Sequence, residues 1–207
     1  MGAPDKCGAG ILRSSSYYDD NADAFIAQTV HADMSPIYAR FLAHIPPGGA
    51  IIDAGSGSGR DAAWFRAAGY DVEAFDASPA MVQATRRHAQ VPTTHMTFEN
   101  LEFARTYDGI WACASLLHVR KSELGDVLRR LLQALKPDGC LYCSFKQGSG
   151  ERRVEGRYFN DMNEEHLRAV VEQASGQVLD LWTTGDVRAD RSRERWLNSL
   201  LQRRPMK

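Results

Sequence analysis

Two hydrophobic patterns alternate along most of this chain. Residues 50–54 form a short apolar run rich in β-branched side chains, which is typical of a strand buried in a parallel sheet. Residues 121–135 instead carry leucine and valine at helical spacing. The same two patterns predict further strands over residues 72–75, 94–99, 107–113 and 140–145, and further helices over residues 19–29, 35–44, 59–68 and 78–89.

Past residue 145 the order of elements changes. The polar segment 146–156 is expected to be a loop, and Asn163 is expected to cap a helix that begins with two glutamates. Two last strands are predicted over residues 177–184 and 195–201, joined as an antiparallel hairpin. Because strands and helices alternate before this point, the chain is predicted to form an α/β domain with a mainly parallel sheet.

Length and composition restrict the class of protein. A chain of 207 residues suits a single domain with a full core, and a formal net charge of -1 gives no reason to expect nucleic acid as the partner. No apolar run approaches the roughly 20 residues that a membrane span needs. Residues 1–16 are small and polar, so they are expected to be a flexible lead-in and not a signal peptide, which predicts a cytoplasmic protein.

The cysteines do not predict a metal site. The pair Cys140 and Cys143 has CxxC spacing, but both residues fall on a predicted strand. Side chains three positions apart on a strand point to opposite faces, so the two thiols are poorly placed to share a metal or a disulfide.

A glycine-rich turn follows the first predicted strand. Gly55, Gly57 and Gly59 permit a tight turn and close approach of a ligand, and the helix behind them offers free backbone N–H groups. Dinucleotide sites have the spacing GxGxxG, whereas Arg60 stands here where the last glycine would be. Asp53 would repel a pyrophosphate but suits an ammonium or sulfonium ligand.

The second strand is predicted to end at Asp76. A carboxylate at this place can accept hydrogen bonds from both hydroxyls of a ribose. Together, the glycine turn and the two aspartates indicate a site for a cationic amino-acid nucleoside. An incidental tight turn in a βα unit is the structural alternative.

These segments resemble the motifs of class I S-adenosylmethionine-dependent methyltransferases. The resemblance lies in residues 51–61, 75–81 and 135–141, and it extends over about residues 17–201. It implies a Rossmann-like, doubly wound seven-stranded sheet of order 3-2-1-4-5-7-6, with strand 7 antiparallel and helices on both faces. It also implies a methyltransferase domain over residues 17–207, in which residues 17–45 form an N-terminal helical lid. Within the family, the chain looks most similar to small-molecule methyltransferases of the tellurite-resistance type.

The resemblance implies a set of residues that bind S-adenosylmethionine, or its product S-adenosylhomocysteine. Family members often have an aspartate near the adenine amine, where this chain has Glu99 and Asn100, and the choice between these two stays open. The expected cofactor-binding residues are Tyr17, Asp53, Gly55, Ser56, Gly57, Gly59, Arg60, Asp61, Asp76, Ala77, Met81, Glu99, Asn100, Leu101, Cys113 and Ala114.

Catalytic candidates follow from the same resemblance. His118 would face the acceptor and could remove a proton from it, or it could be a surface or helix-capping residue. Tyr18, beside Tyr17, could belong to a lid over the cofactor or only pack the first helix. Lys146 is the basic residue best placed for an anionic acceptor. The later arginines 152, 153, 157, 188, 191, 193 and 195 are expected in solvated loops, unless one or two of them hold such an acceptor.

The main functional hypothesis is methyl transfer to oxygen, nitrogen, sulfur or a chalcogen of a small molecule, by a monomer or weak homodimer. An RNA or protein methyltransferase is the first alternative, disfavoured by the near-neutral charge. A non-catalytic S-adenosylmethionine-binding module and a nucleotide-dependent oxidoreductase are the others. The acidic pair argues against the module, and Arg60 argues against the oxidoreductase.

Overall fold

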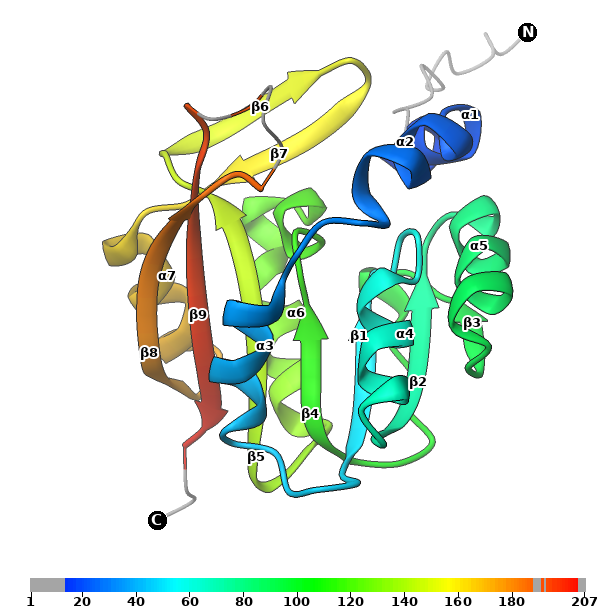
Figure 1. The fold of residues 1–207 in the computed structure, drawn as a ribbon. Coiled ribbons are helices and arrows are strands. Elements are labelled where there is room, and N and C mark those ends of the chain that lie inside the picture. Colours follow the sequence, from blue (N-terminus) through cyan, green and yellow to red (C-terminus); the bar gives the residue numbers. More distant parts are fainter. Residues whose placement is uncertain (1–13, 188–190, 192, 205–207) are drawn as a thin grey trace, which may run out of the picture.

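A seven-stranded sheet runs through the centre of the molecule, with helices on both faces (Figure 1). The computed structural model describes residues 14–187, 191 and 193–204. The strands lie in the order β3-β2-β1-β4-β5-β9-β8, and only the pairs that include β9 are antiparallel. This arrangement confirms the predicted order 3-2-1-4-5-7-6. The strands are β1 Ala50–Ala54, β2 Asp71–Asp76, β3 Thr93–His95, β4 Tyr107–Ala112, β5 Leu135–Lys146, β8 Gly176–Gly185 and β9 Arg195–Arg203.

Two apolar clusters cover the two faces of the sheet. On one face, helices α3 (Ser35–Leu42) and α4 (Arg60–Ala67) contribute to a cluster that includes Ile51. On the other face, helices α6 (Lys121–Gln133) and α7 (Glu164–Gln173) pack with a cluster that includes Ile52. Successive residues of β1 thus enter opposite clusters, and every residue of this strand is buried, as a central parallel strand requires.

The same alternation separates the CxxC pair. Cys140 lies in the cluster under α3 and α4, and Cys143 lies in the cluster under α6 and α7. Burial raises the pKa of each thiol to about 12, so both are un-ionised apolar side chains. Among the described residues, no group of three or more His, Cys, Asp or Glu side chains could hold a metal ion.

The N-terminal segment differs from the single helix expected over residues 19–29. Two helices are present, α1 (Ser14–Asp20) and α2 (Ala22–Thr29), separated at Asn21. The predicted lead-in over residues 1–16 falls mostly outside the described part of the chain, and α1 begins within its last three residues. By contrast, α3 is part of the core, since its Phe41 is fully buried between the sheet and α4.

The predicted loop over residues 146–156 is wrong. Strands β6 (Gly150–Val154) and β7 (Arg157–Asp161) form an antiparallel hairpin beside the main sheet. Glu155 and Gly156 join them with φ angles of 51° and 78°, the positive values that a tight two-residue hairpin turn requires. In Figure 1 this hairpin stands above the carboxyl ends of the parallel strands, facing α1 and α2. The segment whose conformation was predicted wrongly therefore forms one wall of the cavity described below.

Three other predicted boundaries moved. The third strand covers only residues 93–95, because the chain turns into the short 3₁₀ helix η1 (Phe98–Asn100). Helix α6 ends at Gln133, so β5 begins at Leu135, before the predicted strand, and Asp138 lies at an irregularity inside β5, with a φ angle of 64°. Helix α5 (Pro79–Ala89) agrees with its predicted range, and the Ser78 hydroxyl caps it by accepting a hydrogen bond from the Met81 N–H.

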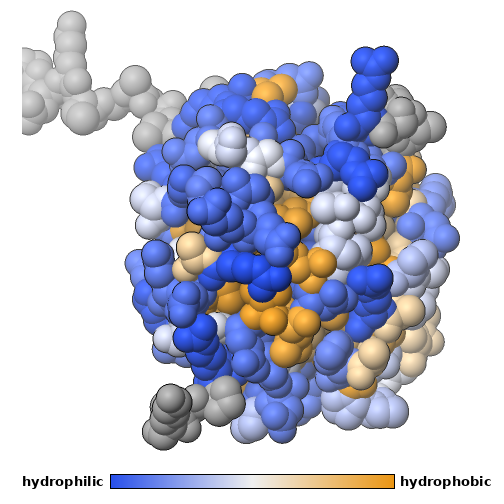
Figure 2. Space-filling model, turned by 90° about the vertical axis from the view of Figure 1, so that its left-hand side faces the viewer, coloured by the Kyte–Doolittle hydropathy of each residue, from blue (hydrophilic) through white to orange (hydrophobic). Residues whose placement is uncertain are grey.

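Strand β8 forms one edge of the sheet. It has a register irregularity between Val178 and Asp180, and Leu179 between them is 40% exposed. Figure 2 views the molecule from this side, where apolar side chains are visible between polar ones. In the described part of the chain, no helix is both long and apolar enough to cross a membrane.

Candidate active site

The glycine turn joins β1 to α4 and is packed too tightly for side chains. Gly55 has a φ angle of 82°, and a Cβ there would lie 2.4 Å from the Cβ of Ser115. Gly59 has a φ angle of 78°, and its Cβ would lie 2.8 Å from the Cα of Thr85 in α5. Real Cβ atoms do not make contacts this short, so both positions require glycine on two independent grounds. The turn is consequently rigid and keeps its backbone close to the cavity above it.

Asp76 at the end of β2 anchors this turn. Its Oδ2 accepts a hydrogen bond of 2.9 Å from the Gly57 N–H, and its Oδ1 accepts one of 2.9 Å from the Ser78 N–H. An ionised carboxylate offers about four acceptor positions, so two remain for a ligand. Burial raises the pKa of Asp76 above its ordinary value, although its backbone hydrogen bonds, chiefly those from Ser78 and Gly57, oppose this.

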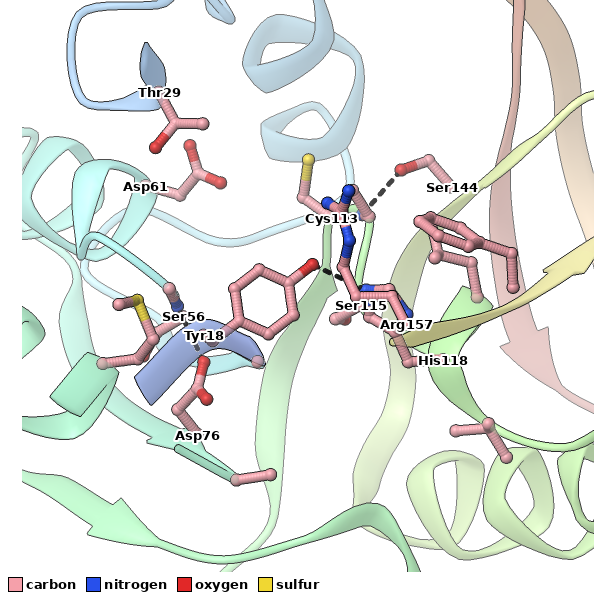
Figure 3. Close-up of a pocket in the computed structure, with 18 of the residues that line it drawn as sticks. Tyr18, Thr29, Ser56, Asp61, Asp76, Cys113, Ser115, His118, Ser144 and Arg157 are labelled. Carbon is pink, nitrogen blue, oxygen red and sulfur yellow. Dashed lines mark hydrogen bonds between the residues drawn. The ribbon is translucent and has the colours of Figure 1, made fainter. Parts of the chain in front are cut away.

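A cavity of about 950 Å³ opens above the turn (Figure 3). It extends from Asp76 and η1 to the β6–β7 hairpin, with α1 and α2 on one side. The volume lies at the upper end of the range of roughly 300–1,000 Å³ that is usual for small-molecule sites. The predicted site residues that line it are Tyr18, Gly55, Ser56, Gly57, Arg60, Asp61, Asp76, Ala77, Met81, Glu99, Asn100, Cys113, Ala114, His118 and Lys146.

Four predicted cofactor residues do not line the cavity: Tyr17, Asp53, Gly59 and Leu101. Gly59 shapes the turn from behind, and the ring of Tyr17 packs against Arg157 instead. Both Glu99 and Asn100 reach the cavity, together with Phe98, which the sequence analysis did not single out. Phe98 also packs edge-on against Phe75 of β2, so it forms an apolar wall at this end.

Asp53 lies beneath the turn and not in it. It is 1% exposed, and its Oδ2 has no hydrogen-bond partner. Burial, and then repulsion from nearby Asp61, raise the pKa of Asp53 well above its ordinary value. A buried carboxylate oxygen without a hydrogen-bond partner is costly, so it persists where nearby positive charge offsets that cost. Its contribution to a cationic ligand would be electrostatic and not a direct contact across the cavity wall.

Asp61 and Arg60 form a buried, hydrogen-bonded ion pair beside Asp53. Asp61 accepts hydrogen bonds from the Tyr38 hydroxyl, from the Trp111 indole at 2.8 Å, and from two nitrogens of Arg60 at 2.6 and 2.8 Å. Burial raises the pKa of Asp61, but the charge and hydrogen bonds of Arg60 outweigh it and hold the pKa below its ordinary value. Arg60 is thus already engaged by its neighbour in the chain.

The segment after β4 is strained where it borders the cavity. Ala114 has a φ angle of 52°, and its N–H donates a hydrogen bond of 2.9 Å to the Ser144 hydroxyl of β5. The Ser115 hydroxyl donates one of 2.6 Å to the Ala54 carbonyl of β1. A non-glycine residue in this conformation costs energy, so its surroundings must hold it there. Burial raises the pKa of the Cys113 thiol to about 12, which makes it a poor nucleophile.

Tyr18 and His118, one hundred residues apart, meet in the cavity (Figure 3). His118 Nδ1 lies 2.7 Å from the Tyr158 carbonyl oxygen, which can only accept, so Nδ1 carries the proton. Nε2 therefore accepts the hydrogen bond of 2.8 Å from the Tyr18 hydroxyl. Burial, together with the charges of Arg157 and Lys146, lowers the pKa of His118 to about 4, so the ring is neutral at pH 7.

The two basic residues near this pair differ in their surroundings. Lys146 forms an ion pair with Glu194 and lies 5.6 Å from the rings of Phe159 and Trp196. Arg157 was expected in a solvated loop, and this expectation is wrong, because the residue is 8% exposed and lines the cavity. Arg188 lies outside the described residues.

The sheet order, the glycine turn and Asp76 at the tip of β2 together define a class I methyltransferase fold of the Rossmann-like type. The family described as "Methyltransferase domain" matches residues 26–180, well over half of the chain. The chain belongs to this family and is an S-adenosylmethionine-dependent methyltransferase domain.

Solved structures with this fold include methyltransferases and a cyclase. The 1,6-didemethyltoxoflavin-N1-methyltransferase of Burkholderia thailandensis, with bound 1,6-didemethyltoxoflavin and S-adenosylhomocysteine, is 24% identical, with a TM-score of 0.77 over 99% of this chain and 94% of that one. The CcbJ methyltransferase of Streptomyces caelestis is 15% identical, with a TM-score of 0.72 over 94% and 99%. The [4+2]-cyclase SpnF is 15% identical, with a TM-score of 0.73 over 94% and 97%. At these identities the likeness concerns the fold. No curated protein matches the sequence.

Proposed function

We propose that this protein transfers the methyl group of S-adenosylmethionine to a small-molecule acceptor held between α1 and the β6–β7 hairpin. The observation that carries the proposal is the single cavity, which joins the glycine turn to the chamber around Tyr18 and His118. A cofactor over the turn and an acceptor in this chamber would share one enclosed space. Two of the structural neighbours, from Burkholderia thailandensis and Streptomyces caelestis, are named as methyltransferases, the first with a bound small molecule.

The residues around the turn fit the cofactor. Asp76 keeps two acceptor positions free for the ribose hydroxyls, and Phe98, with Glu99 or Asn100, would enclose the adenine. Asp53, Asp61 and Asp76 outnumber Arg60 here, which favours a positively charged ligand. When bound, the cofactor supplies an electrophilic methyl group on a sulfonium centre, so the protein has to align the acceptor and exclude water.

The first two helices would form the lid. Phe25 of α2 lies where a Cβ on Gly57 would be only 3.2 Å from its ring, so α2 closes directly over the turn. Tyr18 of α1 packs edge-on against Phe25 and reaches His118 on the opposite wall. We restrict the lid to α1 and α2, because α3 belongs to the core. A chamber covered in this way suits a small acceptor better than RNA or protein.

Tyr18 would orient the acceptor, and His118 would act through Tyr18. The tyrosine hydroxyl donates its proton to Nε2, and its oxygen, which also interacts with the Arg157 guanidinium, would accept a hydrogen bond from an O–H or N–H of the acceptor. His118 cannot take that proton directly while Nε2 is occupied, and its pKa of about 4 makes it a weak base. His118 is thus assigned as a positioning residue, which modifies the role expected from the sequence. Lys146 adds positive charge to the wall but is already paired with Glu194.

The test is methyl transfer from labelled S-adenosylmethionine to a panel of hydroxylated aromatics, heteroaromatic amines, thiols, selenite and tellurite. The two oxyanions follow from the resemblance to tellurite-resistance enzymes. We expect S-adenosylhomocysteine and a methylated small molecule to form in equal amounts. Label that enters added RNA or protein, and no small molecule, would favour the macromolecular alternative. Absence of cofactor binding in calorimetry would refute the assignment of the site.

A further inference from the structure

The charged side chains are unevenly distributed along the cavity. Carboxylates gather at the glycine turn, where Asp53, Asp61 and Asp76 lie together with Arg60. The opposite end, beneath the β6–β7 hairpin, is mainly basic: Lys146, Arg153, Arg157 and Arg191 line it, together with Asp186, which accepts a hydrogen bond from the Trp196 indole. Both ends are largely removed from water, so these charges are weakly screened and select ligands of opposite sign. A cationic cofactor accounts for the carboxylates at the glycine turn but not for the basic residues beneath the hairpin.

Arg157 is the residue at the basic end that lacks a full set of partners. It opens strand β7, and its side chain is 10% exposed. The guanidinium carbon lies over two rings, 4.1 Å from the centroid of Tyr17 and 5.4 Å from that of Phe159. Its Nη2 donates a hydrogen bond of 2.7 Å to Glu155, while Nε is buried and has no hydrogen-bond partner. A buried N–H of a charged group without an acceptor is costly, so a ligand oxygen there would be strongly favoured.

The pairing with Glu155 leaves most of this charge available. Glu155 belongs to the hairpin turn, and its side chain is 65% exposed, so water screens the ion pair from the outer side. The cavity side of Arg157 faces Tyr18 and His118, which are both neutral at pH 7 (Figure 3). Lys146 differs, because its partner Glu194 is less exposed, at 35%, and compensates its charge. Of these two buried cations, Arg157 and not Lys146 is therefore the one whose charge is available to an acceptor.

We infer that the methyl acceptor is a small anion, and that Arg157 binds its carboxylate or a similar oxyanion group. The inference rests on the proposed function, since it identifies the chemical class of that enzyme's acceptor. A guanidinium binds a carboxylate through two parallel N–H donors, and Nε is the donor that is unoccupied here. The rings of Tyr17 and Phe159 pack against the guanidinium, so little side-chain freedom is lost on binding.

The test uses matched pairs of probes that differ only in charge: 2-hydroxybenzoate with 2-hydroxybenzamide, and nicotinate with nicotinamide. Calorimetry measures their binding to protein loaded with S-adenosylhomocysteine, and turnover is measured with S-adenosylmethionine. We expect at least one carboxylate to bind tenfold or more tightly than its amide. If no carboxylate is preferred over its amide, the inference is wrong. The comparison needs no variant, and the binding data test the inference even if no probe is methylated.

Variants then locate the preference. Arg157→Gln should remove at least tenfold of the carboxylate affinity, raise KM more than it lowers kcat, and leave the amide and S-adenosylhomocysteine within about twofold of their wild-type affinities. Arg157→Lys keeps the charge but not the two parallel donors, so its carboxylate affinity should lie between those of the wild type and Arg157→Gln. Arg168→Gln, at an exposed arginine of α7 that pairs with Glu164 and does not line the cavity, is the control and should keep the preference. An unchanged preference in Arg157→Gln, or equal losses for carboxylate and amide, would assign Arg157 a structural role instead.

Discussion

Asp76 provides the sharpest test of the cofactor site, because the structure shows how much of its hydrogen-bonding capacity is free. Two of about four acceptor positions are taken by the N–H groups of Gly57 and Ser78. The other two match the two hydroxyls of a ribose. A neutral hydrogen bond contributes a net of about 0.5–1.5 kcal/mol and one to a charged group contributes more, so the pair contributes at least about 1–3 kcal/mol.

Asp76→Ala should therefore weaken S-adenosylhomocysteine binding by roughly 5- to 150-fold, since about 1.4 kcal/mol is a factor of ten. The assay is isothermal calorimetry at pH 7.5. Asp71→Ala is the matched control, because Asp71 begins the same strand at the opposite end and pairs on the surface with Arg105. Its affinity for the ligand should stay within about twofold of the wild type.

The dependence on pH gives a second view of the same carboxylate. Burial raises the pKa of Asp76 above its ordinary value, and only the ionised form accepts from both hydroxyls. Ligand affinity should thus be full at neutral pH and decline as the pH falls through this raised pKa, with a smaller decline in Asp76→Ala. Wild-type affinity in a folded Asp76→Ala protein, or the same acid decline in both proteins, would show that the ribose is not bound here.

Three further changes test the turn and the Tyr18–His118 pair. Gly55→Ala combines a positive φ angle with a contact of 2.4 Å, so it should cost about 2–5 kcal/mol of folding stability and most cofactor affinity, measured by urea unfolding and calorimetry. Gly69→Ala shares the positive φ but meets no atom within 4 Å, so a loss as large as that of Gly55→Ala would contradict the packing argument. Tyr18→Phe should lower turnover by about 10- to 100-fold through misaligned acceptor, with little change in cofactor affinity, and full turnover would remove Tyr18 from the mechanism. His118 has a folded pKa of about 4 against an ordinary 6.5, so the unfolded chain takes up the proton first and stability declines as the pH falls from 6.5 towards 4. The decline due to this residue is about 3 kcal/mol over the whole window, and His118→Asn should remove it; an unchanged stability difference between pH 7 and pH 4.5 in the variant would contradict the buried, neutral state.

The cofactor end of the site was predictable because its signals are local. The β-branched run at residues 50–54, the glycines after it and Asp76 after the next strand all specify backbone geometry within a few residues. The sheet order followed from the resemblance, and the structure confirms it. Asp53 shows the limit of this reasoning, since its position in the motif did not reveal that its side chain points beneath the turn into the cluster with Asp61.

The acceptor end was predicted less well because its residues come from distant segments. The β6–β7 hairpin has a charged, exposed strand in β6, so its composition resembles that of a loop, and pairing with β7 decides its conformation. The same pairing turns Arg157 inward, against the expectation that Lys146 is the main basic residue. Composition alone could not rank these two residues, because burial and ion pairing with Glu155 and Glu194 distinguish them.

The sequence by itself thus determined the sheet, the glycine turn and the methyl donor, since hydrophobic periodicity and backbone constraints act between near neighbours. Tertiary structure alone decided which side chains surround the acceptor. Tyr18 meets His118 across one hundred residues, and Arg157 lines the cavity in contact with rings from two elements. Such contacts depend on how whole elements pack, and therefore the charge and shape of the acceptor chamber are properties of the folded chain.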